Sequence, residues 1–348
     1  MRKVKWGVIG CGGIADRRTI PGMMLADNAE LVAVMDVNAE LATQCKEKYS
    51  AKYSFTDEAS LLALDEVEAV YIASPVFCHK KQAMAAAAAG KHILLEKPVG
   101  LTVEEAKEIA AYCEAKGVKL GVGFVMRFHT FHQQMRDAIA SGKLGEIVSA
   151  RAQLSCWYPE MEGVWRQDPA KSGGGALMDM GVHCVDLIRY ITGLEVTNVA
   201  GMIGNQIFSY KVEDAGAILM RLSNGATAYV DANFNIPDDA AVCKLEIYGT
   251  KGSFFAEGTV SQEEAGIAIL RAADDTTAYD ASQARSDSEA VELTGAGGNL
   301  YTKEVEAFGR AVLGEIAVPV TTADAIRSQE VVEAAYRSHA EGKSIPTV

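Results

Sequence analysis

An aspartate and a histidine, Asp179 and His183, lie four residues apart in a stretch whose apolar pattern predicts a helix over 176–191. Side chains four positions apart project from the same face of a helix, one turn apart, and can reach a common point. Histidine has an ordinary pKa of about 6.5, so it can accept and return a proton near neutral pH. The pair can therefore act in general acid/base chemistry, although such a pair is more often an ion pair on a helix surface.

A lysine, Lys97, follows the apolar run 92–96 and precedes Pro98. If that run is a strand of a parallel sheet, Lys97 stands at the carboxyl end of the strand, where open sheets of this kind bind their ligands. An ammonium group there can stabilise negative charge that develops on an oxygen atom during a reaction. Lys97 is therefore a candidate electrostatic group, and the ordinary alternative is a solvated lysine at a strand end.

A glycine-rich hexapeptide at residues 10–15, GCGGIA, fits the pattern G-x-G-x-x-A directly after an apolar run and before a predicted helix. Glycine lets the backbone approach a pyrophosphate, and the start of the helix supplies amide donors and a favourable dipole. The alternative is a tight turn that binds no nucleotide. The residues predicted to form this phosphate loop are Gly10, Gly12, Gly13 and Ile14.

An acidic residue, Asp36, ends the second predicted strand, 31–36. A carboxylate at this place can accept hydrogen bonds from both hydroxyls of the adenosine ribose, and it would repel a 2′-phosphate. The loop and the acid together predict a site for NAD rather than NADP. Arg17 and Arg18 leave the opposite preference open, because either could bind a phosphate near the ribose.

The elements that must position these residues alternate in the first 125 residues, where short β-branched runs are separated by amphipathic stretches. This pattern is typical of a parallel sheet with helices on both faces, a doubly wound α/β fold. The predicted strands are 5–9, 31–36, 69–73, 92–96 and 120–124, and the predicted helices are 18–26, 39–49, 58–63, 80–89 and 103–116. Residues 1–125 are therefore predicted to form an NAD-binding Rossmann domain.

Beyond residue 125 the pattern changes to runs with alternating apolar and polar residues, joined by glycine-containing turns at 224–225 and 249–251. These features indicate antiparallel hairpins. The predicted strands are 147–158, 196–203, 215–222, 226–234, 243–248, 252–256 and 267–271, and the predicted helices are 131–141, 176–191, 300–313 and 323–339. Residues 126–348 are predicted to form a C-terminal α+β domain with an open, mainly antiparallel sheet, in which 257–298 is weakly patterned.

The composition narrows the range of partners. The 348 residues include 33 lysines and arginines and 46 aspartates and glutamates, and the net charge of −13 repels phosphate backbones and anionic lipid surfaces. No apolar run approaches the roughly 20 residues that span a bilayer. The seven cysteines form no C-x-x-C pair and no H-E-x-x-H is present, so neither a disulfide framework nor a metal site is predicted. We expect a cytoplasmic protein without nucleic-acid or membrane partners.

Two further segments carry a resemblance to a known family. Glu96-Lys97-Pro98 follows the fourth predicted strand, and residues 173–183, GGGALMDMGVH, open the predicted helix of the second domain. Together with GCGGIA, in this order along nearly the whole chain, they resemble the family of glucose-fructose oxidoreductase, inositol dehydrogenase and MocA. Within it, the Trp165-Arg166 pair and residues 299–301 resemble 1,5-anhydrofructose reductase and related sugar enzymes. The resemblance implies a Rossmann domain, an α+β domain with an open sheet, and a homo-oligomer, dimer or tetramer.

The resemblance also implies roles for the candidate residues. Oxidation of a secondary alcohol removes a hydride from carbon and a proton from oxygen, so a base and a positive charge are needed. His183 is predicted to be the general acid/base, Lys97 the electrostatic stabiliser or a proton relay, and Asp179 the group that orients substrate hydroxyls or tunes the other two. NAD carries the hydride. We expect a nicotinamide ring between the two domains, within reach of Lys97 and His183.

Other residues are implied at the cofactor or the substrate. The further cofactor contacts are Ser74, Pro75, His79, Glu96, Lys97, Arg127, Trp165 and Arg166, and the substrate contacts are Lys97, Trp157, Arg166, Asp179, His183 and Tyr301. Ordinary alternatives are a helix cap for His79, a structural ion pair for Arg127, an interdomain contact for the Trp165-Arg166 pair, and core packing for Trp157 and Tyr301. His129 and His132 are predicted to be helix-surface residues.

The predicted function is an NAD(H)-dependent oxidoreductase that interconverts a secondary hydroxyl and a ketone on a sugar, sugar derivative, glycoside or cyclic polyol. One alternative is a glycoside-processing enzyme that transiently oxidises the ring at C3 with NAD and thereby acidifies the neighbouring C–H bond. Another is a non-catalytic, nucleotide-sensing regulator with the same fold. The presence of Lys97, Asp179 and His183 together disfavours the regulator.

Overall fold

The structure is a computed structural model that describes residues 2–273, 281 and 290–347. It divides into two compact units. Unit 1 combines Met1–Val125, Asp168–Gly173 and Gly298–Gln329, and unit 2 combines Met126–Gln167, Gly174–Gly297 and Glu330–Val348. The predicted division after residue 125 coincides with the end of the first stretch of unit 1. Residues 274–280 and 282–289, which belong to the weakly patterned stretch of the sequence, lie outside the described residues.

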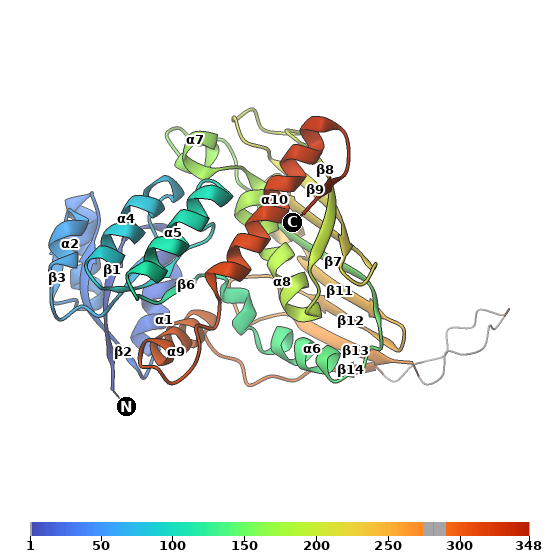
Figure 1. The fold of residues 1–348 in the computed structure, drawn as a ribbon, viewed down its shortest axis with the longest axis horizontal. Coiled ribbons are helices and arrows are strands. Elements are labelled where there is room, and N and C mark those ends of the chain that lie inside the picture. Colours follow the sequence, from blue (N-terminus) through green and yellow to red (C-terminus); the bar gives the residue numbers. More distant parts are fainter. Residues whose placement is uncertain (1, 274–280, 282–289, 348) are drawn as a thin grey trace. The chain divides into compact units, whose positions relative to one another are not determined.

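Unit 1 contains a six-stranded sheet in the order β3-β2-β1-β4-β5-β6, in which every strand pair is parallel (Figure 1). This order confirms the predicted doubly wound α/β fold. The strands are β1 (Val4–Ile9), β2 (Ala29–Met35), β3 (Tyr53–Phe55), β4 (Ala69–Ile72), β5 (His92–Leu95) and β6 (Leu120–Val122). The helices are η1 (Ala15–Thr19), α1 (Ile20–Leu25), α2 (Ala39–Tyr49), α3 (Glu58–Leu62), α4 (Val76–Ala88), α5 (Val103–Ala115), α7 (Pro169–Ser172) and α9 (Leu300–Val312).

Five helices of unit 1, α2, α3, α5, α7 and α9, begin at side chains that accept hydrogen bonds from their first free amides. Asn38 caps α2 by accepting from the backbone N–H groups of Glu40 and Leu41, at 2.9 and 3.3 Å. Thr102 caps α5 by accepting from Glu105 N at 3.2 Å. These local signals explain why the α2 and α5 boundaries follow so closely from the sequence.

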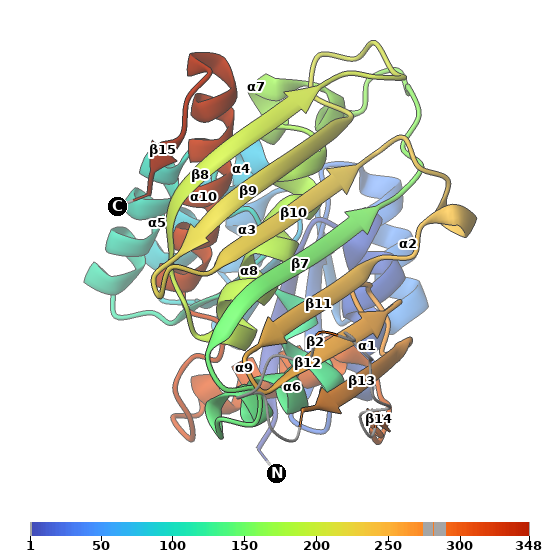
Figure 2. The same ribbon diagram turned by 90° about the vertical axis from the view of Figure 1, so that its right-hand side faces the viewer.

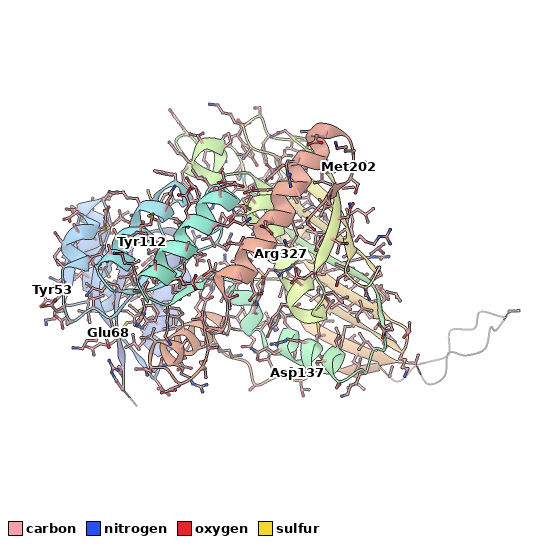
Figure 3. All side chains as sticks on the ribbon, in the orientation of Figure 1. Tyr53, Glu68, Tyr112, Asp137, Met202 and Arg327 are labelled. Atoms are coloured by element: carbon pink, nitrogen blue, oxygen red, sulfur yellow. The ribbon has the colours of Figure 1, made fainter. Side chains whose placement is uncertain are left out.

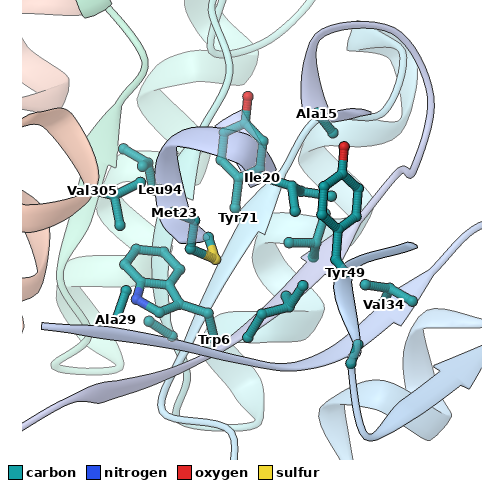
Figure 4. Packing of buried hydrophobic residues seen from close by; sticks show 14 of the residues in the cluster. Trp6, Ala15, Ile20, Met23, Ala29, Val34, Tyr49, Tyr71, Leu94 and Val305 are labelled. Atoms are coloured by element: carbon teal, nitrogen blue, oxygen red, sulfur yellow. The ribbon is translucent and has the colours of Figure 1, made fainter. Parts of the chain in front are cut away.

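The core of unit 1 forms around Trp6, which is fully buried on β1 and packs against Phe308 of α9, with ring centroids 5.7 Å apart. Met23 of α1 belongs to the same cluster and is drawn with Trp6 in Figure 4. On the opposite face of β1, an added Cβ at Gly7 would lie 2.7 Å from Leu61 of α3, so helices cover both faces of the sheet. The assignment of α9 to the second domain is therefore wrong, because its apolar face packs on the first sheet.

Unit 2 contains a nine-stranded sheet in the order β14-β13-β12-β11-β7-β10-β9-β8-β15 (Figure 2). All neighbours are antiparallel except β7 and β10, which are parallel, so the prediction of an open, mainly antiparallel sheet is confirmed. The strands are β7 (Ile147–Ser155), β8 (Val196–Gly204), β9 (Ala215–Leu222), β10 (Thr227–Asn233), β11 (Lys244–Gly249), β12 (Gly252–Glu257), β13 (Ile267–Ala272), β14 (Ala290–Glu292) and β15 (Ile345–Pro346). Both predicted hairpin turns join antiparallel neighbours.

Helices α6 (Thr130–Ala140) and α8 (Val182–Thr192) lie on one face of this sheet, together with the helical turn η4 (Leu177–Gly181). Side chains on the other face remain exposed, and Met202 of β8 is 81% exposed (Figure 3). The remaining short turns are η2 (Val125–Phe128), η3 (Trp165–Gln167) and η5 (Asp238–Ala240), and α10 (Thr322–Glu341) contributes residues to both units. Within the described ranges, no helix combines the length and the apolar character that a membrane span requires.

Candidate functional site

The glycine loop of unit 1 connects β1 to η1. Gly10 has φ +95°, and an added Cβ there would lie 2.9 Å from the backbone of Ala73, so this position requires glycine. At Gly12 and Gly13, in contrast, no heavy atom of the described chain lies within 4 Å of an added Cβ. The loop therefore presents open backbone directly before a helix, which is the room that a dinucleotide pyrophosphate needs.

Asp36 follows β2 and stands beside this loop. Its Oδ2 accepts a hydrogen bond from the backbone N–H of Cys11 at 2.9 Å, and its Oδ1 accepts from the N–H of Asn38 at 2.9 Å. Each carboxylate oxygen has a second lone pair, so the side chain can still accept from ribose hydroxyls. The loop and Asp36 thus fit the adenosine and pyrophosphate parts of NAD. The alternative that Arg17 or Arg18 binds a 2′-phosphate stays a prediction.

Glu96 and Lys97 follow directly after β5. Glu96 Oε1 accepts a hydrogen bond from the Tyr71 hydroxyl at 2.6 Å, and that hydroxyl accepts from Thr19 Oγ1 at 2.8 Å. An added Cβ at Gly123 would lie 3.1 Å from Glu96 Oε1, so glycine at this position makes room for the carboxylate. Through this chain of bonds, Glu96 ties the residues at the end of β5, including the half-buried Lys97, to the helical turn that follows the glycine loop.

His79 does not have the exposure that a cofactor contact requires. Its ring is fully buried, with Nε2 3.0 Å from the carbonyl oxygen of Ser74 and Nδ1 3.0 Å from that of Pro98. Burial lowers the pKa of His79 to about 4, so the imidazole is neutral near neutral pH. The prediction of His79 as a cofactor contact is therefore corrected: it joins the segment of Ser74 and Pro75 to the segment that follows Lys97.

Asp179 and His183 lie on consecutive elements of unit 2. Asp179 is half-buried within η4, a π-helical turn, and His183 stands in the first turn of α8 with 9% exposure. The sequence predicts one continuous helix here, whereas the structure has a π turn at its start. Such wide turns occur frequently at functional sites, because they redirect side chains without ending the helix.

Arg166 is brought to the same place in unit 2. Its guanidinium carbon lies 4.3 Å from the centroid of the Trp165 ring, and its Nε is 3.6 Å from Asp179 Oδ1. The side chains of Arg166 and Asp179 are 35% and 28% exposed, so their attraction is screened by water and contributes little to stability. The predicted residues Trp165, Arg166 and Asp179 therefore form one polar cluster that remains open to a ligand.

Arg127 has a structural partner instead of an exposed position. Its Nε and Nη2 bind the two carboxylate oxygens of Asp186 at 2.7 and 2.6 Å, and both side chains are buried. The guanidinium also lies 4.9 Å from the centroid of the Tyr190 ring. A two-point ion pair of this kind occupies the guanidinium fork. The structural alternative for Arg127 is thus favoured over the predicted cofactor contact.

The prediction that His129 and His132 are surface residues is wrong. His132 is fully buried, with Nδ1 2.8 Å from Met126 O and Nε2 3.0 Å from Thr259 Oγ1. His129 is 1% exposed and caps α6 by accepting from Phe131 N at 3.2 Å. The helical pattern of the sequence does not reveal the segment around Thr259, which covers this end of α6.

The predicted aromatic contacts divide into a buried and an exposed residue. Tyr301 is 3% exposed within unit 1, so its predicted substrate contact is corrected to core packing. Trp157 is 42% exposed in unit 2 and packs edge to face against Phe208, with ring centroids 5.1 Å apart. Phe208 in turn stacks on Tyr210 at 5.5 Å. Trp157 thus remains a candidate for stacking on a sugar face, and its two aromatic neighbours are absent from the sequence-based candidates.

A buried acid, Glu213, is also absent from the sequence-based candidates. It is 8% exposed and accepts hydrogen bonds from the backbone N–H groups of Gly175 and Leu177, at the start of η4. The only signal in the sequence is an acidic pair, Glu213-Asp214, immediately before an apolar strand, where charges are usually avoided.

Comparisons with known proteins agree with this geometry. Residues 4–124 match the oxidoreductase family with an NAD-binding Rossmann fold, and residues 132–255 match the GFO/IDH/MocA C-terminal domain. The chain is 30% identical over 346 residues to 1,5-anhydro-D-fructose reductase from Ensifer adhaerens, which covers 98% of this chain and 97% of that protein. It is 27% identical over 262 residues to myo-inositol 2-dehydrogenase from Thermotoga maritima, covering 72% and 74%.

Among solved structures, levoglucosan dehydrogenase in complex with NADH and levoglucosan has a TM-score of 0.88 and 23% sequence identity. The match covers 99% of this chain and 100% of that chain. This likeness supports the fold. The two family matches span most of the chain, and the similarity to the anhydrofructose reductase runs from end to end. The chain therefore belongs to the GFO/IDH/MocA family of oxidoreductases, whose N-terminal domain is an NAD-binding Rossmann domain.

Proposed function

We propose that this chain interconverts a secondary hydroxyl and a ketone on a sugar, sugar derivative or cyclic polyol, with NAD(H) as its cofactor. The observation that carries the proposal is the cluster of Asp179, Arg166 and Trp165, which joins an acid, a cation and an aromatic face in a half-exposed place. Such a set suits a neutral ligand with many hydroxyl groups. The relatives named for anhydrofructose and myo-inositol support the same substrate class.

The chemistry assigns separate tasks to the residues of the chain. His183 takes the proton from the substrate hydroxyl, and in the reverse direction returns it to the carbonyl oxygen. Lys97 stabilises the negative charge on that oxygen. Asp179 accepts hydrogen bonds from neighbouring hydroxyls and so orients the substrate, and Arg166 lies beside it, with its Nε 3.6 Å from Asp179 Oδ1. When bound, NAD accepts or supplies the hydride.

We infer a preference for NAD over NADP from Asp36. Its carboxylate already accepts from the Cys11 amide, so it is fixed beside the loop, where a 2′-phosphate would meet a negative charge. The test is a titration of the purified chain with each cofactor. Tighter binding of NAD is expected, and tighter binding of NADP would overturn the assignment and favour Arg17 or Arg18 as a phosphate contact.

We also infer that the chain forms a homo-oligomer through the open face of its nine-stranded sheet. Met202 and Leu219 are exposed on the neighbouring strands β8 and β9, and exposed apolar side chains on adjacent strands favour burial against a partner. Light scattering after size exclusion should give a mass at least twice that of the chain, and Leu219→Glu should reduce it. A monomeric parent would contradict the inference.

We retain the cytoplasm as the proposed location. All seven cysteines are free thiols in the structure, although each of the two units contains several of them. Proteins in oxidising compartments commonly use such residues for disulfides, whereas reducing compartments keep them as thiols. Titration of the thiols in protein isolated under non-reducing conditions tests this, and fewer than seven reactive groups after unfolding would count against it.

The function is tested by a screen of monosaccharides, inositols and glycosides with NAD and NADP, combined with mass spectrometry of the purified protein. Reduction of added NAD by one member of the panel supports a dehydrogenase. Product formation with a cofactor that stays bound would favour the glycoside-processing alternative. Cofactor binding without turnover of any substrate would favour the nucleotide-sensing regulator.

A further inference from the structure

The segment that leads into η4 is held by one buried carboxylate. Glu213 Oε2 accepts from Gly175 N at 2.8 Å, and its Oε1 accepts from Leu177 N at 3.0 Å. The backbone carbonyl of Glu213 accepts from Ala176 N at 3.1 Å. A single residue of a distant segment therefore accepts hydrogen bonds from the amides of Gly175, Ala176 and Leu177. Amides at a helix start have no partner within the helix.

A tyrosine fixes the carboxylate from the other side. The hydroxyl of Tyr336, on α10, donates to Glu213 Oε1 at 2.7 Å. Burial raises the pKa of Glu213, while the Tyr336 hydroxyl and the amide donors oppose that rise. Both carboxyl oxygens of Glu213 accept hydrogen bonds, and the partial positive charge at a helix start favours an acceptor there. The side chain of Glu213 is therefore held at a defined position inside unit 2.

The glycines of this segment are required by the same contacts. An added Cβ at Gly175 would lie 2.1 Å from the carbonyl oxygen of Glu213, and one at Gly174 would lie 2.2 Å from the Tyr336 hydroxyl. Glycine before a helix often makes room for a ligand. At Gly174 and Gly175 the space is filled instead by Glu213 and Tyr336 of the chain itself.

We propose that Glu213, held by Tyr336, is a positioning residue that sets the orientation of Asp179 and His183. The inference rests on the proposed function, in which these two side chains act on the substrate. Asp179 stands two residues beyond Leu177, whose amide Glu213 binds, and His183 stands one turn further along. A shift of the helix start is transmitted to both side chains, and a misplacement of about 1 Å can reduce turnover by about 10²-fold.

The direct test is Glu213→Gln. The glutamine has the same size, but its NH₂ group must face an amide N–H or the Tyr336 hydroxyl, so at least one of the bonds to the start of η4 or to Tyr336 is lost. We expect kcat to fall by about 10- to 100-fold, and the pH at which kcat is half-maximal to shift, because His183 changes its surroundings. The dissociation constant of NAD should stay within about twofold, since the Rossmann loop belongs to unit 1.

Two further variants separate positioning from general stability. Glu195→Gln is the matched control: Glu195 pairs with Arg189 near the other end of α8, so kcat should stay within about twofold of the parent even if the melting temperature falls. Tyr336→Phe keeps the two backbone bonds of Glu213 and removes one donor, and we expect kcat to fall by about threefold to tenfold. If Glu213→Gln fails to fold, Tyr336→Phe alone decides.

The outcomes distinguish this inference from the proposed function. If His183→Ala is inactive but Glu213→Gln keeps the kcat and the pH profile of the parent, the positioning role is overturned. If Glu213→Gln does not fold, a Tyr336→Phe variant with the kcat and pH profile of the parent overturns it in the same way. A fully active His183→Ala overturns the proposed function itself. Loss of kcat in Glu213→Gln with unchanged NAD binding, together with a parent-like Glu195→Gln, supports the inference.

Discussion

Two glycine segments, one in each unit, share their composition and differ in what surrounds them. The first, residues 10–13, precedes η1, and the second, residues 174–175, precedes η4; both η1 and η4 are π-helical turns. Each segment is bound by an acid from a distant part of the chain, Asp36 in unit 1 and Glu213 in unit 2. An added Cβ at Gly12 meets no described atom within 4 Å, whereas one at Gly175 meets Glu213 O at 2.1 Å.

The comparison teaches that glycine before a helix has two distinct physical causes. In the first glycine segment it leaves backbone open to a ligand, and in the second it lets another part of the chain come close enough to bind the helix start. The acids differ in the same way. Asp36 is partly exposed beside open space, and Glu213 is buried and accepts from backbone amides and from the Tyr336 hydroxyl. We therefore expect the first segment to control cofactor affinity and the second to control turnover.

The largest effect is expected from His183→Ala. If the second unit supplies the acid/base group, kcat should fall by about 10²-fold or more, while the affinity for NAD stays nearly the same. Steady-state kinetics and a fluorescence titration with NADH measure the two quantities. A parent-like turnover number would remove His183 from the mechanism. A parallel loss of NAD affinity would contradict the expectation that cofactor affinity is controlled by the first glycine segment alone.

Alanine at one glycine of each segment gives the sharpest contrast. Gly175→Ala forces a Cβ against the Glu213 carbonyl and should lower the free energy of unfolding by about 3 kcal/mol. Gly12→Ala meets no atom of the described chain, so the free energy of unfolding should change by less than about 0.5 kcal/mol. Its expected effect is a loss of NAD affinity of about tenfold or more, because the new methyl group occupies the pyrophosphate side of the loop.

Urea unfolding of the two variants and of the parent gives the two changes in free energy of unfolding, and NADH titration of each folded protein gives the change in cofactor affinity. If both substitutions lowered the free energy of unfolding equally, the two glycine segments would not differ in their surroundings as described. Unchanged NAD binding by Gly12→Ala would show that the open side of the loop does not face the cofactor.

A smaller effect is expected from Asp36→Ala. The substitution removes the acceptor for the ribose hydroxyls and the bond from Cys11 N, so NAD should bind about tenfold more weakly. Discrimination against NADP should relax, because the repelling charge is gone. Isothermal titration with both cofactors measures the change, and unchanged NAD affinity would show that Asp36 holds the loop without touching the ribose.

A separate effect, on stability rather than on binding, concerns the pH dependence of folding. His79 has a pKa of about 4 in the folded chain, below its ordinary value of 6.5. The unfolded state therefore binds a proton as the pH falls below 6.5 while the folded state does not, so stability is lost between pH 6.5 and 4 and is fully present above that range. The difference corresponds to about 3 kcal/mol.

Urea unfolding of the parent and of His79→Gln at pH 7 and pH 5 isolates this contribution. The parent should lose about 2 kcal/mol more than the variant, since the variant has no imidazole to titrate. Equal losses for the two proteins would mean that His79 is not the buried neutral link between the Ser74 and Pro98 segments.

Most of the fold follows from local pattern. The five predicted strands of the first domain overlap β1, β2, β4, β5 and β6, because each is a short apolar run between amphipathic helices. β3 was not predicted because its three residues, Tyr53–Phe55, are only half-buried and include a serine, so no apolar run marks them. The position of α9 could not be predicted either, since only the tertiary contact of Phe308 with Trp6 shows which sheet its apolar face covers.

The sequence singles out those candidate residues whose signal is contiguous, and their roles stay predictions. The glycine loop and Asp36 follow the ends of β1 and β2, and Asp179 and His183 lie on the consecutive elements η4 and α8. Glu213 could not be found in this way because it acts on Gly175 from 38 residues away. The burial of His79, His132 and Tyr301 depends on segments distant in the chain, so no local pattern could separate them from exposed candidates.

The most direct test of the central claim is the rate of NADH formation, and of NADH oxidation with the corresponding ketone, by the parent and by Lys97→Met with the best substrate of the panel. The proposed chemistry predicts that the parent works in both directions and that Lys97→Met loses activity in both while still binding NAD. Equal rates for the two proteins would contradict it.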